Sequence, residues 1–231
     1  PDVEQANARL VGSALTPVLR KPIARIIANA ETIQSRLAGP LRGEYSEYAG
    51  NIASAGKHLS TMLDDLGDLE VVEAPDFKTA EEKVDLCDVA RRAAGILGVR
   101  AQDRQIKIIL PDARTNGVVV GEFRRVLQIL INLIGNAIAY SSEGSSVEVV
   151  VEPRLDQTVD LRVIDQGPGV DPAQADKVFD KFERLGRDND GGSGLGLYIS
   201  RRLARAMGGE LSLNIDRDEG AEFVLSLRQA D

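Results

Sequence analysis

The first third of the chain has the apolar spacing of two long helices. Over residues 45–69, apolar side chains recur at alternating intervals of three and four, which indicates a heptad seam between helices packed at a shallow angle. A rougher repeat runs over residues 11–37, and the helix-breaking residues 38–40 separate the two repeats. The pattern therefore predicts an antiparallel helical hairpin within residues 1–72. The positions of the clearer seam are Tyr45, Tyr48, Ile52, Ala55, Leu59, Met62, Leu66 and Leu69.

A hairpin of this kind needs a further partner for its apolar surface. Two helices alone bury little of a heptad seam, and a second copy would close a four-helix bundle. Helices from a part of the protein outside this sequence could close the bundle instead. Because twofold symmetry dominates among oligomers, we favour a homodimer formed through residues 1–72.

The remaining chain has the shorter, mixed spacing of strands and helices. Residues 73–83 are polar, contain Pro75 and are predicted to be a linker to a second domain at 84–231. The order of the elements lacks strict strand–helix alternation, which favours an α+β sandwich with helices on one face of a single sheet. We predict helices near 87–100, 121–139, 173–183 and 195–207, and strands near 106–110, 146–152, 159–165, 209–215 and 221–228.

Composition narrows the class of protein. Hydrophobic residues make up 43% of 231 residues, enough for a packed core, and the net charge of −8 argues against a nucleic-acid-binding surface. The single cysteine excludes an internal disulfide. No apolar run approaches the roughly 18 residues of a membrane span, and no signal peptide is visible. We therefore expect a cytoplasmic piece of a longer protein, whose upstream part could carry a membrane anchor.

Two asparagines interrupt the most apolar predicted helix. Asn132 and Asn136 lie four residues apart and therefore share one helix face. A buried amide needs hydrogen-bond partners, and its carbonyl oxygen is a ligand type that Mg²⁺ accepts. Taken alone, the pair favours ordinary hydrogen bonding in the core.

Two glycine-containing segments follow the asparagines. Asp165 ends a predicted strand, and Gly167 and Gly169 after it let the backbone turn close to a flat ligand such as adenine. The same residue types also suit a simple surface turn. Residues 191–197 are glycine-rich and lead into a helix, whose N-terminal amides attract phosphate. This second segment is neither a Walker loop nor a clear dinucleotide fingerprint, because no GK[ST] follows and no strand feeds it directly.

In order and spacing, these segments resemble the N, G1 and G2 boxes of the Bergerat-type ATP-binding fold, which histidine kinases, gyrase, Hsp90 and MutL share. Residues 178–183 resemble the F box of histidine kinases. The chain thus resembles a bacterial two-component sensor histidine kinase, which implies ATP and Mg²⁺ as ligands. By this resemblance, Asn132 and Asn136 would bind Mg²⁺ and phosphates, and Asp165 would bind adenine in a pocket whose wall includes Gly167 and Gly169. Phe179 and Phe182 would anchor a lid at about 184–193. The nucleotide phosphates would be held by Gly192, Gly194, Leu195 and Gly196.

The hairpin departs from this family where the family carries its chemistry. The family's acceptor motif reads approximately H-E-L-R-T-P-L, and residues 17–23 read PVLRKPI. Pro17 replaces the histidine and has no nucleophilic atom. Val18 replaces the neighbouring acid, and Lys21 replaces the Thr or Asn that positions water for dephosphorylation. We therefore assign no catalytic residue to the hairpin, which keeps packing positions and loses the chemical ones.

Three functions remain compatible with these residues. The first is a pseudokinase that binds ATP and acts by conformation on a response regulator, a phosphotransferase or another kinase. The second is an active kinase with an unconventional acceptor, either on a partner protein or at His58, which we expect about one helical turn from the level of Pro17. The third is an ATP-independent scaffold, against which the retained glycines and Asp165 argue. The sequence favours the first. A repair- or chaperone-type ATPase is disfavoured because Asn132 stands where those enzymes carry a catalytic glutamate.

Overall fold

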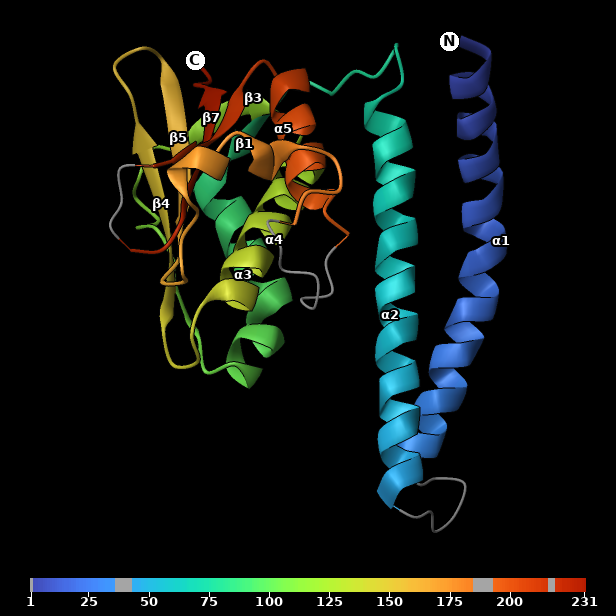
Figure 1. Cartoon of the computed structure of the whole chain (residues 1–231). Helices are drawn as coiled ribbons and strands as arrows, with labels where there is room; N and C mark the ends of the chain where they lie inside the picture. The colour runs from blue at the N-terminus through green and yellow to red at the C-terminus, as the bar shows by residue number, and fades with distance from the viewer. Residues whose placement is uncertain (1, 36–42, 185–192, 216–218) are drawn as a thin grey trace. The chain divides into compact units, whose positions relative to one another are not determined.

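The chain forms two compact units in its computed structural model (Figure 1). Residues 2–35, 43–184, 193–215 and 219–231 are described, with side chains from Val18 onward. The first unit comprises Pro1–Pro75 with Asp188–Leu195, and the second comprises Asp76–Arg187 with Gly196–Asp231. None of the helices in the described part of the chain combines the length and apolar character needed to cross a membrane.

The first unit contains the predicted helical hairpin. Helices α1 (Asp2–Gln34) and α2 (Gly43–Val72) run antiparallel, side by side (Figure 1). The predicted break at residues 38–40 lies outside the described residues, between the end of one helix and the start of the next.

Small residues bring the two helices of the hairpin together. Ala30 on α1 and Ala49 and Ala53 on α2 are buried. Gly56 lies so close to α1 that a Cβ atom there would stand 2.7 Å from Cγ1 of Ile27. The apolar seam predicted from the spacing is instead largely exposed in a single copy. Its exposed members, on both helices, are Val18, Ile26, Ile33, Tyr45, Tyr48, Ile52 and Leu59.

The second unit is a five-stranded sheet with helices on one face (Figure 1). The strand order is β2-β4-β5-β7-β6, with β2 and β4 parallel and all other neighbours antiparallel. The strands are β2 (Lys107–Ile109), β4 (Ser146–Pro153), β5 (Thr158–Ile164), β6 (Glu210–Asn214) and β7 (Glu222–Arg228). The helices are α3 (Leu86–Asp103), α4 (Phe123–Tyr140) and α5 (Gly196–Ala206). This architecture confirms the predicted α+β class.

The core follows from the alternation of the strands and from the apolar face of α4. Val147, Val149 and Val151 of β4 point to one face and are buried, as period-two spacing requires. Asp85 caps α3 by accepting a hydrogen bond from the backbone N–H of Cys87 at 2.9 Å. Helix α4 buries the residues Val126, Ile129, Leu130, Leu133, Ile134, Gly135, Ala137 and Ile138.

Two predictions about elements were wrong, namely the helix at residues 173–183 and the single sheet. Residues 173–183 form two 3₁₀ turns, Pro172–Gln174 and Lys177–Phe179, because Asp180 is extended and ends the second turn. A second sheet, of β1 (Glu82–Asp85) paired antiparallel with β3 (Val118–Gly121), accompanies the first. Strand β1 starts inside the predicted linker, and β3 is too short to show a pattern of its own.

Gly56 gives a test of the hairpin packing. Gly56→Leu should lower the free energy of unfolding of the hairpin by about 2 kcal/mol, because the new side chain overpacks against Ile27. Gly67→Leu is the matched control on α2, since a Cβ atom there meets nothing within 4 Å. The control should be neutral or slightly stabilising, because leucine favours helix over glycine. Thermal unfolding followed by circular dichroism at fixed protein concentration measures both, and equal midpoints would contradict the packing.

Candidate functional site

A cavity with an empty volume of about 570 Å³, part of it open to solvent, lies in the second unit. Its size suits a small ligand. Its walls come from the C-terminal half of α4, the segment after β5, the start of α5 and the start of β7. The lining residues are Asn136, Tyr140, Asp165, Pro168, Gly169, Val170, Val178, Glu183, Arg184, Leu197, Ala221 and Phe223.

Asp165 is the most constrained polar group of this cavity. It follows β5, is 5% exposed and accepts two hydrogen bonds on one carboxylate oxygen. The donors to Oδ1 are the backbone N–H of Gly167 at 2.8 Å and that of Ala221 at 3.0 Å. Since both amides bind Oδ1, the carboxylate is fixed in orientation, and Oδ2 takes neither of these bonds. A fixed carboxylate in a cavity is a suitable acceptor for an exocyclic amino group.

Glycines let the backbone close around this carboxylate. A Cβ atom on Gly167 would lie 2.8 Å from the carbonyl oxygen of Tyr140. Gly169 has φ +69° and would meet the carbonyl oxygen of Gly220 at 2.9 Å. Gly220 has φ +74° and would meet the carbonyl oxygen of Asp165 at 2.0 Å. Sequence reasoning missed Gly220, whose only signal is a glycine just before a strand.

The two asparagines of α4 have different surroundings. Asn136 lines the cavity, as does Tyr140 one turn later. Asn132 is not among the lining residues, and its Nδ2 donates a hydrogen bond to Oγ of Ser200 on α5 at 3.0 Å. Ser200 was not predicted, because nothing in the sequence distinguishes it from other small helical residues.

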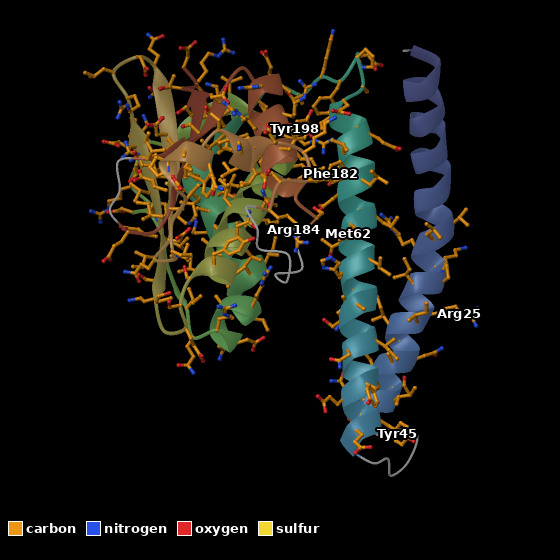
Figure 2. The ribbon with its side chains drawn as sticks, viewed as in Figure 1. Arg25, Tyr45, Met62, Phe182, Arg184 and Tyr198 are labelled. Carbon is orange, nitrogen blue, oxygen red and sulfur yellow. The ribbon has the colours of Figure 1, made fainter. Side chains whose placement is uncertain are left out.

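The two predicted lid anchors also differ. Phe179 is buried and packs edge-to-face on Phe223, with ring centroids 6.2 Å apart. The guanidinium carbon of Arg201 lies 4.6 Å from the Phe179 ring centroid. Phe182 has φ +64° and is 62% exposed (Figure 2). Only Phe179 is therefore held by packing.

The glycine-rich segment is described from Ser193 onward, so Gly192 lies outside the described residues. Gly194 has φ +72°, and the buried Leu195 donates its backbone N–H to Oγ of Ser193 at 3.1 Å. Gly196 begins α5, and Leu197 lines the cavity. The N-terminus of α5 therefore lies beside the cavity, and a helix N-terminus is an arrangement that favours phosphate.

Arg184 brings a positive charge to the cavity and was not predicted (Figure 2). Its backbone N–H donates to Oε1 of Glu183 at 2.9 Å. Its Nη2 atom is buried without a hydrogen-bond partner among the described residues. A guanidinium left open in this way is suited to phosphate oxygens. The sequence gives no signal for Arg184, because nothing distinguishes an arginine after the F-box segment from other charged surface residues.

Comparisons with known proteins agree with this geometry. Residues 121–231 match the family described as histidine kinase-, DNA gyrase B-, and HSP90-like ATPase. Two Caulobacter vibrioides proteins are similar, namely Histidine protein kinase DivJ (29% identity over 91% of this chain and 35% of that protein) and the Non-motile and phage-resistance protein (31% identity over 92% and 26%). The crystal structure of full-length ShkA in complex with AMPPNP is similar over 95% of this chain and 46% of that one, with 26% identity and a TM-score of 0.74.

The chain belongs to the two-component sensor histidine kinase family. Its second unit is the ATP-binding catalytic domain of that family, with a Bergerat-type fold. The chain spans about a third or less of the length of these two Caulobacter relatives.

Residues 17–23, which resemble the acceptor motif of the family, lie on α1. Pro17 is within the helix, with its side chain outside the described set, while Val18 and Lys21 are exposed. Arg20 forms an ion pair with Asp64 of α2. This pair and the approach of Ile27 to Gly56 show which residues of the two helices lie at the same level.

The same alignment places the alternative acceptor. Because Arg20 pairs with Asp64 and Ile27 lies against Gly56, His58 of α2 lies level with the residues near Arg25 of α1. His58 is therefore roughly two helical turns from Pro17. The expected offset of one turn was too small, because the turn of the hairpin was assumed to lie nearer residue 39.

Gly169 tests the histidine kinase cavity with a matched control. Gly169→Ala should weaken ATP binding at least about tenfold, since the side chain both strains a positive φ and pushes Gly220 away from Asp165. Gly144 also has a positive φ, +80°, but a Cβ atom there meets nothing within 4 Å. Gly144→Ala should cost about 1 kcal/mol of stability and leave ATP affinity unchanged. Calorimetric titration measures both affinities, and an equal effect of the two variants would refute the role of Gly169.

Proposed function

We propose that this chain is the dimerisation and ATP-binding core of a histidine kinase that signals by conformation, without phosphorylating its own hairpin. One contrast carries the proposal: the cavity around Asp165 keeps its full set of constrained contacts, whereas Pro17 occupies the acceptor position. The proposed boundaries are residues 1–72 for the hairpin, 73–83 for the linker and 84–231 for the ATPase domain.

The contacts of the cavity support a purine nucleotide with its phosphates. The fixed carboxylate of Asp165 would accept a hydrogen bond from the adenine amino group. Arg184 and the first amides of α5 would meet the phosphates. The complex of ShkA with AMPPNP, an ATP analogue, adds support from a similar protein.

Asn136 is the residue that we propose for Mg²⁺. Its amide lines the cavity, and an amide oxygen is a hard ligand of the type this ion binds. Mg²⁺ commonly takes one or two protein groups together with phosphates and waters, so a single asparagine fits the ion. When bound, Mg²⁺ would neutralise phosphate charge.

The hairpin lacks the groups that phosphotransfer requires. A proline has no nitrogen or oxygen that can attack a phosphoryl group, which rules Pro17 out as a nucleophile. Val18 cannot accept a proton, and Lys21 is a cation where the family has a hydroxyl or amide. His58 lies on the other helix of the hairpin, roughly two helical turns from the level of Pro17. We therefore rank an active kinase with an unconventional acceptor below the pseudokinase.

Conformational signalling needs partners and a nucleotide-dependent equilibrium. The exposed seam of α1 and α2 supports a homodimer through the hairpin. A response regulator, a phosphotransferase or another kinase would then bind the dimer. ATP can shift the dimer between two arrangements only if its affinity for the two differs. Because ATP is the ligand, we propose that the chain acts in the cytoplasm.

The first test separates binding from phosphorylation. The protein should bind ATP with Mg²⁺ in a calorimetric titration and take up no acid-labile label from γ-labelled ATP. Asp165→Asn should abolish binding, whereas Asp160→Asn, at another buried aspartate that lies within β5, should bind normally. If the parent protein took up label and the His58→Ala variant did not, the chain would be an active kinase with an unconventional acceptor. If the parent protein did not bind ATP, only the ATP-independent scaffold would remain.

The second test addresses the dimer. Ile52→Asp combined with Leu59→Asp should convert a dimer to a monomer, because both exposed seam residues would place charges in the bundle core. Ser54→Asp, at an exposed position of α2 outside the seam, should remain dimeric. Light scattering after size exclusion gives the mass of each. A monomeric parent protein would contradict the homodimer.

A further inference from the structure

A buried hydroxyl on α5 has no part in the nucleotide contacts proposed above. Ser200 is 2% exposed and faces α4, where Nδ2 of Asn132 donates to its Oγ at 3.0 Å. The pair joins two helices that both contribute to the cavity, α4 through Asn136 and α5 through Leu197. A change in this bond would therefore alter the position of one cavity wall relative to another.

Asn132 also meets the very start of α5. A Cβ atom on Gly196 would lie 2.4 Å from Oδ1 of Asn132, which leaves room only for glycine at this point. Gly196 and Ser200 are four residues apart and share a helix face. One asparagine side chain therefore spans the first turn of α5, which is the turn that we propose to face the phosphates.

The opposite end of α5 is held separately. Nε of Arg201 lies 2.7 Å from Oε1 of Glu210, and Nε of Arg205 lies 2.8 Å from Oε2 of the same carboxylate. Burial alone would raise the pKa of Glu210, but the two arginine hydrogen bonds outweigh it and the pKa lies below its ordinary value. Glu210 thus ties the C-terminal half of α5 to β6, and the contact of Asn132 is what holds its N-terminal turn against α4.

We propose that Asn132 and Ser200 form a positioning pair that fixes the phosphate-binding turn of α5 against α4, so that Asn132 acts on the nucleotide through α5 and does not ligate Mg²⁺. The division of labour between the asparagines follows from their placement, since Asn136 lines the cavity and Asn132 does not. The inference rests on the proposed nucleotide site.

Nucleotide affinity with and without the metal distinguishes the two roles of Asn132. Asn132→Ala and Ser200→Ala should each weaken ATP binding about fivefold, both with Mg²⁺ and in EDTA, because each removes the same hydrogen bond. The double variant should lose no more than either single one, as expected for two residues of one interaction. Ser200→Thr keeps the hydroxyl and should restore most of the affinity.

Two controls accompany the titrations. Ser226→Ala removes a side-chain hydrogen bond of 2.6 Å to Asp160 elsewhere in the sheet and should leave affinity unchanged. Asn136→Ala should abolish the gain in affinity that Mg²⁺ gives. If Asn132→Ala weakened binding only in the presence of Mg²⁺ and Ser200→Ala had no effect, Asn132 would be a metal ligand and the positioning pair would be refuted.

Hydrogen exchange of the nucleotide-free protein decides the positioning role independently of ATP binding. Amides of residues 196–203 should exchange faster in Asn132→Ala and in Ser200→Ala, and to the same extent, with no change in Ser226→Ala. Unchanged exchange in the two α5-contact variants would overturn the inference. Failure of the parent protein to bind ATP would defeat the proposed function, while the exchange data would still show whether the pair fixes α5.

Discussion

The carboxylate of Asp165 joins the segment after β5 to the segment before β7, and the shape of the cavity depends on this connection. Its Oδ1 receives the N–H of Gly167 just after β5 and the N–H of Ala221 just before β7. The backbone N–H of Asp165 in turn donates to the carbonyl oxygen of Ala221 at 2.9 Å. Because the carboxylate is buried, losing either amide would leave one of its hydrogen bonds unmade, which costs more than such a bond contributes to stability. The same interactions that satisfy Asp165 also present it to the cavity.

Three of the residues that line the cavity, Asn136, Asp165 and Gly169, could be predicted from the sequence because their constraints are local. Asp165, Gly167 and Gly169 follow one strand within a few residues, and the asparagines share a helix face by their spacing alone. Residues that act through long-range contacts left no such pattern. Gly220 is required by a carbonyl oxygen of Asp165, and Ser200 by an amide of α4, and neither partner is near in sequence.

The fold shows the same division between local and long-range information. Long elements such as α4 and β5 have enough residues to display their period, and the predicted bounds differ from the observed ones by only a few residues. The apolar side chains of residues 173–183 have helical spacing, which predicts a helix. Pro172 and the extended Asp180 confine these residues to short turns instead. Strand β3 is defined by its pairing with β1, and a pairing between distant segments leaves no pattern in the local sequence.

The hairpin shows how a heptad pattern can identify a surface without identifying its partner. Spacing indicated a seam, and the structure places small residues such as Ala53 and Gly56 between the two helices of one copy. A close approach of two helices requires small side chains, whereas a four-helix bundle core requires larger ones. We therefore propose that further helices cover the exposed Ile52 and Leu59. We therefore propose that the hairpin keeps a bundle surface while Pro17, which has no nucleophilic atom, removes the phosphoacceptor of the family.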